Sequence, residues 1–275
     1  MINFLHSFTP DPILIQIDPL TIYWYGLFIV SGILSATLVS FKLSSKYNIK
    51  KDTIIDLAFW LIIAGLIGTR VYHVLLELPF YLDNPLDIFK VWEGGLAIHG
   101  GIIAGLITIW WFSWKQNINF WLLTAIIVPG VALAQAIGRW GNYFNQEIYG
   151  VPTSLPWGIP IEFANRVPEF FNFEYFHPTF LYESLGSLII FATLILLHKK
   201  LNTSDLKYKI IVAAYLVLYS LLRFSLEFIR TDSTPTLLGF RFPQIISLAI
   251  IIFITGYFYY YFIKNKQKNA SLAKN

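Results

Sequence analysis

Three arginines lie inside apolar stretches of this sequence, and they are its residues with the clearest capacity for chemistry. Arg70, Arg139 and Arg223 each sit in a stretch of about 20 mostly apolar residues, which is long enough to cross a bilayer. A charged side chain at the centre of such a span costs about 2.5 kcal/mol or more. Arginine stays charged there and binds phosphate through paired hydrogen bonds. The three positions therefore indicate an anionic, lipid-like substrate.

The surroundings of Arg223 have helical spacing. Tyr219, Arg223 and Glu227 are four residues apart, and Arg230 follows Arg223 by seven, so we expect all four on one helix face. One interpretation is that Arg223 and Glu227 only neutralise each other, as buried charges must. That pair leaves Arg139 and Arg230 without partners, which favours a shared site for an anion.

A second polar segment begins next to Arg139. Residues 138–150 place Arg139, Asn142, Asn145 and Glu147 among three glycines at the end of an apolar stretch. Glycine and asparagine are also common in plain turns. The adjoining arginine at the membrane boundary favours a set of hydrogen-bond donors for a headgroup.

His99 lies between two glycine pairs, Gly94-Gly95 and Gly100-Gly101. A histidine at this position can act as a general base or can only hydrogen-bond a phosphate. Glycine pairs in spanning helices are commonly packing devices. The spacing alone leaves a functional and a structural role open.

The composition defines the setting of these residues. The chain is 56% hydrophobic and 13% charged, against about 25% charged in ordinary soluble domains. So much apolar surface requires a bilayer as solvent. The absence of cysteine excludes disulfides, thiolate metal sites and a cysteine nucleophile of the protein's own. Prolines interrupt the first 20 residues, which do not resemble a cleavable signal peptide.

Seven apolar stretches predict an all-α integral membrane protein with one polytopic domain over 1–275. The expected spans are 21–41, 53–76, 96–114, 120–140, 178–198, 208–229 and 242–263. Thirteen lysines fall on one side of the membrane and four lysines or arginines on the other, so the N-terminus is expected outside and the C-terminus in the cytoplasm. This orientation places the ionisable and phenolic groups of six spans in one outer layer, where we expect them to face a shared cavity.

The longest loop, residues 142–176, is expected on the outer side and is rich in aromatic residues. It can be an interfacial aromatic belt, because Trp and Tyr prefer that depth. It can also be a small extracytoplasmic cap that grips a partner.

The chain resembles the prolipoprotein diacylglyceryl transferase family. The matching segments occur in the family's order and are 24–26 (Trp-Tyr-Gly), 68–70, 94–101, 138–150, 177–183 and 223–230, with 243–245 fitting as well. The 138–150 stretch is the family's signature and the most specific of these segments.

The resemblance implies transfer of the diacylglyceryl group of phosphatidylglycerol to the lipobox cysteine of a prolipoprotein signal peptide. A thioether forms and glycerol phosphate leaves, which is the first step of bacterial lipoprotein maturation. The expected partners are these two substrates and membrane lipid, with no nucleic acid, metal or cofactor. The expected location is the bacterial cytoplasmic (inner) membrane.

Through the resemblance, His99, Arg139 and Arg223 are the expected catalytic residues, with Arg139 contacting phosphatidylglycerol. The motif positions expected to line the site are Tyr25, Asn142, Asn145, Glu147, Tyr219, Glu227 and Arg230. The base that activates the thiol stays open between His99, Glu147 and Glu227.

Three positions depart from the family pattern. Phe180 replaces a usual glutamine, Ala125 replaces an aspartate found in many members, and Thr231-Asp232 follows Arg230 without the frequent proline. Two other functions remain as alternatives, namely a transporter of anionic solutes and a lipid-binding or scaffold relative without activity.

Overall fold

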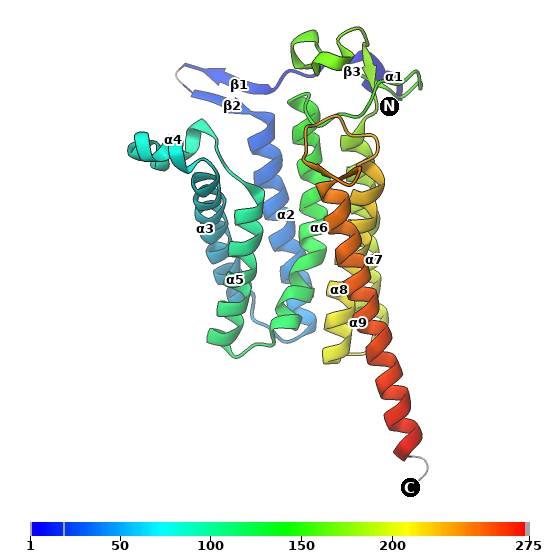
Figure 1. The fold of residues 1–275 in the computed structure, drawn as a ribbon. Helices are drawn as coiled ribbons and strands as arrows, with labels where there is room; N and C mark the ends of the chain where they lie inside the picture. Colours follow the sequence, from blue (N-terminus) through cyan, green and yellow to red (C-terminus); the bar gives the residue numbers. More distant parts are fainter. Residues whose placement is uncertain (1, 19, 273–275) are drawn as a thin grey trace. The chain divides into compact units, whose positions relative to one another are not determined.

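The computed structural model describes residues 2–18 and 20–272, and it is mostly helical (Figure 1). Seven long helices occupy the seven predicted stretches. They are α2 (Trp24–Lys46), α3 (Lys51–Leu76), α5 (Ile98–Gln116), α6 (Phe120–Phe144), α7 (Thr179–Lys200), α8 (Asp205–Leu226) and α9 (Phe242–Leu272).

Six of the seven helices are long and apolar enough to cross a membrane, namely α2, α3, α6, α7, α8 and α9. Helix α5 is not among them. It has 19 residues and includes His99, Gly100 and Gly101 near its start and Lys115 and Gln116 at its end. The membrane class is therefore confirmed with six candidate spans, and α5 as a seventh span stays a prediction.

Short elements join the long helices. They are α1 (Ile2–Ser7), β1 (Ile13–Ile17), β2 (Leu20–Tyr23), α4 (Leu78–Asp83), η1 (Pro85–Phe89), η2 (Val91–Glu93), β3 (Ile159–Pro160), η3 (Phe163–Asn165), η4 (Pro168–Phe170), β4 (Tyr175–Phe176), β5 (Thr236–Leu237) and β6 (Phe240–Arg241). The strands form three antiparallel two-stranded sheets, which are β1–β2, β3–β4 and β5–β6.

The chain divides into two compact units. Unit 1 comprises residues 1–36 and 128–275, and unit 2 comprises residues 37–127. Unit 2 is built on the packing of α3 against α5, where a Cβ on Gly100 would lie 2.0 Å from the carbonyl oxygen of Gly68. Only glycine permits two helices to approach this closely, which gives the second glycine pair a packing role.

Close contacts join the long helices of unit 1. Helix α8 packs against both α7 and α9 (Figure 1). Close backbone approach also joins α2 to α6, because a Cβ on Gly130 would lie 2.7 Å from the carbonyl oxygen of Ala36. The start of α7 and the ends of α6 and α8 all belong to this unit, and the signature segment continues from α6.

The predicted loop 142–176 holds the last residues of α6, the β3–β4 sheet and two short 3-10 helices. Its core buries Tyr149, Ile159 and Phe176 together with Phe180 at the start of α7. Phe180 stacks on Tyr143 with 4.5 Å between ring centroids. Phenylalanine at this departure from the family pattern therefore fills an aromatic core.

Candidate active site

Glu183, in the first turns of α7, joins two arginines from other parts of unit 1. Its Oε2 lies 2.5 Å from Nη2 of Arg139, near the end of α6. Its Oε1 lies 2.8 Å from Nη1 of Arg230. The sequence-based interpretation that Arg139 and Arg230 lack partners is therefore wrong, because one buried carboxylate serves both.

Glu227 is the second shared carboxylate. Arg223 and Glu227 form the predicted i,i+4 pair, with 2.8 Å between Nη2 and Oε2. The other oxygen of Glu227 lies 3.0 Å from Nε of Arg241, just before α9. The Glu227 side chain is fully buried. Each of its oxygens lies within 3.0 Å of a guanidinium nitrogen, but neither has a hydrogen-bond donor among the described residues.

Arg230 does not share a helix face with Arg223, contrary to the prediction. Helix α8 ends at Leu226, and the chain then turns so that Arg230 pairs in an isolated bridge with Gly150 of the signature segment. Arg230 still reaches the cluster from this loop. The prediction extended the helical period four residues too far.

Asp232 completes the loop side of the cluster. It accepts a 2.7 Å hydrogen bond from Nε of Arg230 and lies 3.7 Å from Nη2 of Arg241. Burial alone would raise the pKa of the Asp232 carboxyl. The hydrogen bond and charge of Arg230, together with Arg241, outweigh it and hold that pKa below its ordinary value.

The arginine cluster, defined as Arg139, Arg223, Arg230 and Arg241 with Glu183, Glu227 and Asp232, carries more positive than negative charge. It holds four guanidinium groups against three carboxylates, a surplus of one positive charge. Nη1 of Arg223 is buried and has no hydrogen-bond acceptor within the part of the chain that the structure describes. Oε1 of Glu183 lies 4.0 Å from this nitrogen. The cluster can therefore accept a further anion.

The signature segment connects to this cluster through side chains. Nη1 of Arg139 donates to Oδ1 of Asn142 at 3.2 Å, and Nδ2 of Asn142 donates to Oε1 of Glu147 at 2.6 Å. Arg139, Asn142 and Glu147 thus form one hydrogen-bonded row. A Cβ on Gly141 would lie 2.7 Å from the Tyr25 ring, so this glycine lets the ring rest on α6 next to that row.

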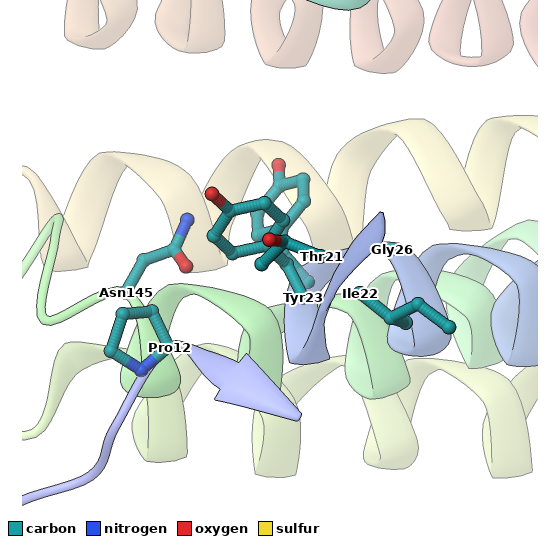
Figure 2. A pocket seen from close by; sticks show the side chains of 7 residues that line it. Pro12, Thr21, Ile22, Tyr23, Gly26 and Asn145 are labelled. Atoms are coloured by element: carbon teal, nitrogen blue, oxygen red, sulfur yellow. The ribbon is translucent and has the colours of Figure 1, made fainter. Parts of the chain in front are cut away.

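Tyr25 and Asn145 also line an open groove of about 550 Å³. Pro12, Thr21, Ile22, Tyr23 and Gly26 form the rest of its lining (Figure 2). No charged residue belongs to this lining. The groove therefore differs in chemistry from the arginine cluster.

A smaller pocket of about 240 Å³ opens directly at the cluster. Glu227, Arg230 and Arg241 form its charged side, and Phe228 and Phe240 form an apolar side. This combination suits a ligand with an ionic group and an apolar portion.

A half-buried polar row lies at the start of α7. Nε1 of Trp157 donates to the Tyr182 hydroxyl at 2.8 Å, and the same hydroxyl lies 3.1 Å from Nδ1 of His177. Burial lowers the pKa of His177, which favours the neutral ring. We assign this row to fixing the 142–176 loop on α7.

Arg70 and His99 belong to unit 2. Arg70 donates to five backbone carbonyl groups, those of Ile88, Gly94, Gly95, Asp87 and Lys90. It thereby fixes a loop in which Gly94 and Gly95 adopt φ values of +93° and +69°, which favour glycine. The sequence indicated no partner for Arg70, and the structure shows that its partner is the backbone of this loop.

His99 follows that loop in the first turn of α5. Its ring is exposed, and its centroid lies 5.9 Å from that of Tyr72. Within unit 2 it belongs to no cluster of charged side chains among the described residues. Its catalytic role stays a prediction.

The structure thus brings together Arg139, Arg223, Glu227 and Arg230, with Asn142 and Glu147 attached to Arg139. Tyr219 lies close enough to Arg223 to interact with its charge. Sequence reasoning missed Glu183 and Arg241 as members of the cluster. An acid in the fifth position of a mostly apolar helix was the available signal for Glu183. Arg241 had no such signal, because only folding of the 227–241 loop brings it to Glu227.

Spanning helices, a positively charged cluster at the helix ends and a pocket with one ionic and one apolar side define a membrane protein that handles an anionic amphiphile. The family model for prolipoprotein diacylglyceryl transferase matches residues 12–260. The chain therefore belongs to the prolipoprotein diacylglyceryl transferase family.

Proteins of similar sequence carry the name phosphatidylglycerol–prolipoprotein diacylglyceryl transferase. The chain is 41% identical to the phosphatidylglycerol–prolipoprotein diacylglyceryl transferase of Nostoc sp. over 88% of this chain and 86% of that protein. It is 41% identical to the transferase of Synechococcus elongatus over 93% of this chain and 89% of that protein. It is also 40% identical to that of Prochlorococcus marinus, strain MIT 9215, over 97% of both chains.

Proposed function

We propose that this protein transfers the diacylglyceryl group of phosphatidylglycerol to the lipobox cysteine of a prolipoprotein signal peptide. The cysteine thiol loses its proton, and its sulfur forms a bond to the glycerol carbon. The bond from that carbon to the phosphate oxygen breaks, and glycerol phosphate leaves with the electron pair. The acceptor supplies the nucleophile, in agreement with a chain that contains no cysteine.

The observation that carries this proposal is the incomplete neutralisation of the arginine cluster. Four arginines face three carboxylates, and Nη1 of Arg223 has no hydrogen-bond acceptor among the described residues. A phosphate placed there gains charge-assisted hydrogen bonds at the point where negative charge develops on the leaving oxygen. Transfer at an alkyl carbon needs this stabilisation more than any oxyanion hole.

Arg139 and Arg223 are the proposed phosphate clamp. They come from different helices, and the buried Glu183 lies 2.5 Å from the former and 4.0 Å from the latter. Asn142 and Glu147 extend from Arg139 and suit the glycerol headgroup, whose hydroxyls donate and accept hydrogen bonds. Tyr25, Asn145, Tyr219 and Arg230 are proposed as lining residues.

Three groups remain candidates for the base that takes the thiol proton. Glu227 suits this role least, because each of its oxygens faces an arginine. Glu147 is exposed, and its carboxylate accepts a hydrogen bond from the Asn142 amide. His99 is exposed, and histidine side chains commonly serve as general bases in catalysis. We propose His99 as the base.

The distribution of lysine supports an orientation with the N-terminus outside and the C-terminus in the cytoplasm. In this orientation the arginine cluster faces the outer leaflet, and residues 142–176 form an extracytoplasmic cap. The proposed location is the bacterial inner membrane, with α5 as a seventh span.

The direct test uses purified protein in nanodiscs of phosphatidylglycerol with a synthetic lipobox peptide. Mass spectrometry is expected to detect a diacylglyceryl-peptide and an equimolar amount of glycerol phosphate. A peptide with serine in place of the cysteine is the matched control and is expected to give neither product. Absence of product with verified lipid and peptide overturns the proposal, and uptake of phosphate into sealed vesicles without product indicates a transporter.

A further inference from the structure

The β1–β2 hairpin presents an unpaired strand edge. The sheet has two strands only, so each strand has one side with no strand beside it. Backbone groups of an antiparallel strand alternate between facing the partner and facing outward. Natural edge strands are usually protected by charges, proline or a covering element. Residues Leu20–Tyr23 of β2 are uncharged and mostly exposed, so this edge lacks the usual side-chain protection.

The 550 Å³ groove follows this strand. Thr21, Ile22 and Tyr23 of β2 line it together with Asn145 of the signature segment. In the view of Figure 2, Asn145 lies at one end of the lining and Ile22 at the other, with Thr21 and Tyr23 between them. The groove thus runs from an open strand edge to the signature segment.

The chemistry of the lining selects the occupant. Four of its residues have polar, uncharged side chains, and the other three are apolar. The polar ones are Thr21, Tyr23, Tyr25 and Asn145. A phosphate has no counter-charge here, whereas the arginine cluster supplies several. Lipid tails cannot satisfy the outward backbone groups of a strand edge, because hydrocarbon has no donors or acceptors. An extended peptide satisfies them through main-chain hydrogen bonds and places alternate side chains in the groove.

The groove ends beside the proposed reaction centre. Tyr25 lines the groove, and its ring rests on Gly141, between Arg139 and Asn142 in the sequence. An acceptor peptide bound along β2 therefore extends toward the residues proposed to hold the phospholipid.

We infer that the free edge of β2 and its groove bind the acceptor polypeptide as an added strand, with uncharged side chains of the peptide in the groove. This inference rests on the proposed function. It names the surface that recognises one of the two substrates.

The first experiment uses the wild-type protein with acceptor peptides that carry one backbone N-methyl group at successive positions. Removing a main-chain donor that bonds β2 is expected to raise the peptide KM about tenfold, as the loss of one hydrogen bond does. The neighbouring donors face away, so the effect is expected at alternate positions with kcat retained. If the unmodified peptide is a substrate but the KM values of the N-methyl series do not alternate with position, the inference is overturned. If no peptide is a substrate, the proposed function is overturned instead.

The second experiment introduces a charge into the groove. Ile22→Asp is expected to raise the KM for an acidic peptide more than tenfold and to leave the KM for phosphatidylglycerol unchanged. Ile15→Asp is the matched control, because Ile15 is paired with Ile22 in the sheet but does not line the groove. A rise in the lipid KM instead of the peptide KM assigns the groove to lipid and overturns the inference. Since the N-methyl series needs no variant, the inference stays testable if Ile22→Asp fails to fold.

Discussion

The carboxylate of Glu183 lies 2.5 Å from the guanidinium of Arg139, which joins the start of α7 to the end of α6. The same carboxylate lies 2.8 Å from Arg230 and 4.0 Å from Arg223. One buried negative charge therefore holds three positive charges that would otherwise repel each other. This arrangement permits arginines from three segments to converge on a single anion.

Replacing this shared charge tests the arrangement. We expect Glu183→Gln to destabilise the protein by about 3 kcal/mol, because a buried partner of an ion pair is removed. We also expect transfer to fall about 100-fold, since Arg139 loses the group that positions it. Thermal unfolding and product formation in nanodiscs measure both effects. Glu169→Gln, at an exposed acid of the 142–176 loop, is the control and is expected to change neither.

The two arginines of the proposed clamp are expected to act on turnover more than on folding. Arg139→Ala and Arg223→Ala each remove a counter-charge of the leaving phosphate, which costs about 10²- to 10³-fold in kcat. Glu183 keeps Arg230 and Glu227 keeps Arg241 in these variants, so neither acid is left unpaired. Arg139→Lys is expected to restore little, because lysine cannot bind phosphate bidentately. Full activity of Arg139→Ala would falsify the clamp.

The low pKa of Asp232 predicts that the protein loses stability at acid pH. Its pKa is lower in the folded protein than the ordinary 3.8, because Arg230 stabilises the carboxylate. The contribution of the ionised Asp232 to the stability of the fold is complete above pH 3.8, and it is lost as the pH falls through the lower folded pKa. Unfolding temperatures measured from pH 6 to pH 2.5 are expected to fall less steeply in Asp232→Asn than in wild type. Parallel curves for the two proteins contradict this prediction.

Arg70 predicts local rather than catalytic effects. Arg70→Met removes the donor of five backbone hydrogen bonds, so amide exchange over residues 87–95 is expected to accelerate at least tenfold. Lysine has three donors at most, so the exchange rate in Arg70→Lys is expected to lie between those of the wild type and Arg70→Met. Lys90→Met removes only the more exposed ion pairs to Asp87 and Glu93 and is expected to have little effect.

His99→Gln separates a base from a scaffold residue. If His99 takes the thiol proton, transfer by the variant is low at pH 7 and rises toward pH 9, because a free thiol ionises near pH 8.5. The wild-type rate is expected to depend less on pH over that range. Substantial activity of the variant at pH 7 removes His99 as the base and leaves Glu147 and Glu227 as candidates.

Hydrophobicity determined the helices but not their exact ends. All seven predicted stretches form helices, because bilayer-length apolar segments satisfy their backbone groups only internally. The end of α8 was predicted three residues too late, since the apolar pattern continues through Phe228 and Ile229. The turn after Leu226 is decided by contacts with the signature segment, where Gly150 pairs with Arg230.

The sequence by itself determined the membrane class, the family and the arginines with chemical potential, because residue type and spacing suffice for each. Only the tertiary structure decided which acid serves which arginine. Glu183 is 44 residues from Arg139 and 47 from Arg230, and Arg241 reaches Glu227 through a folded loop. Ion pairs depend on distances of a few ångströms in space, and these are fixed when α6, α7 and the loop after α8 pack together. Arg139, first an unpaired charge in an apolar stretch, is therefore one member of a shared and incompletely neutralised cluster.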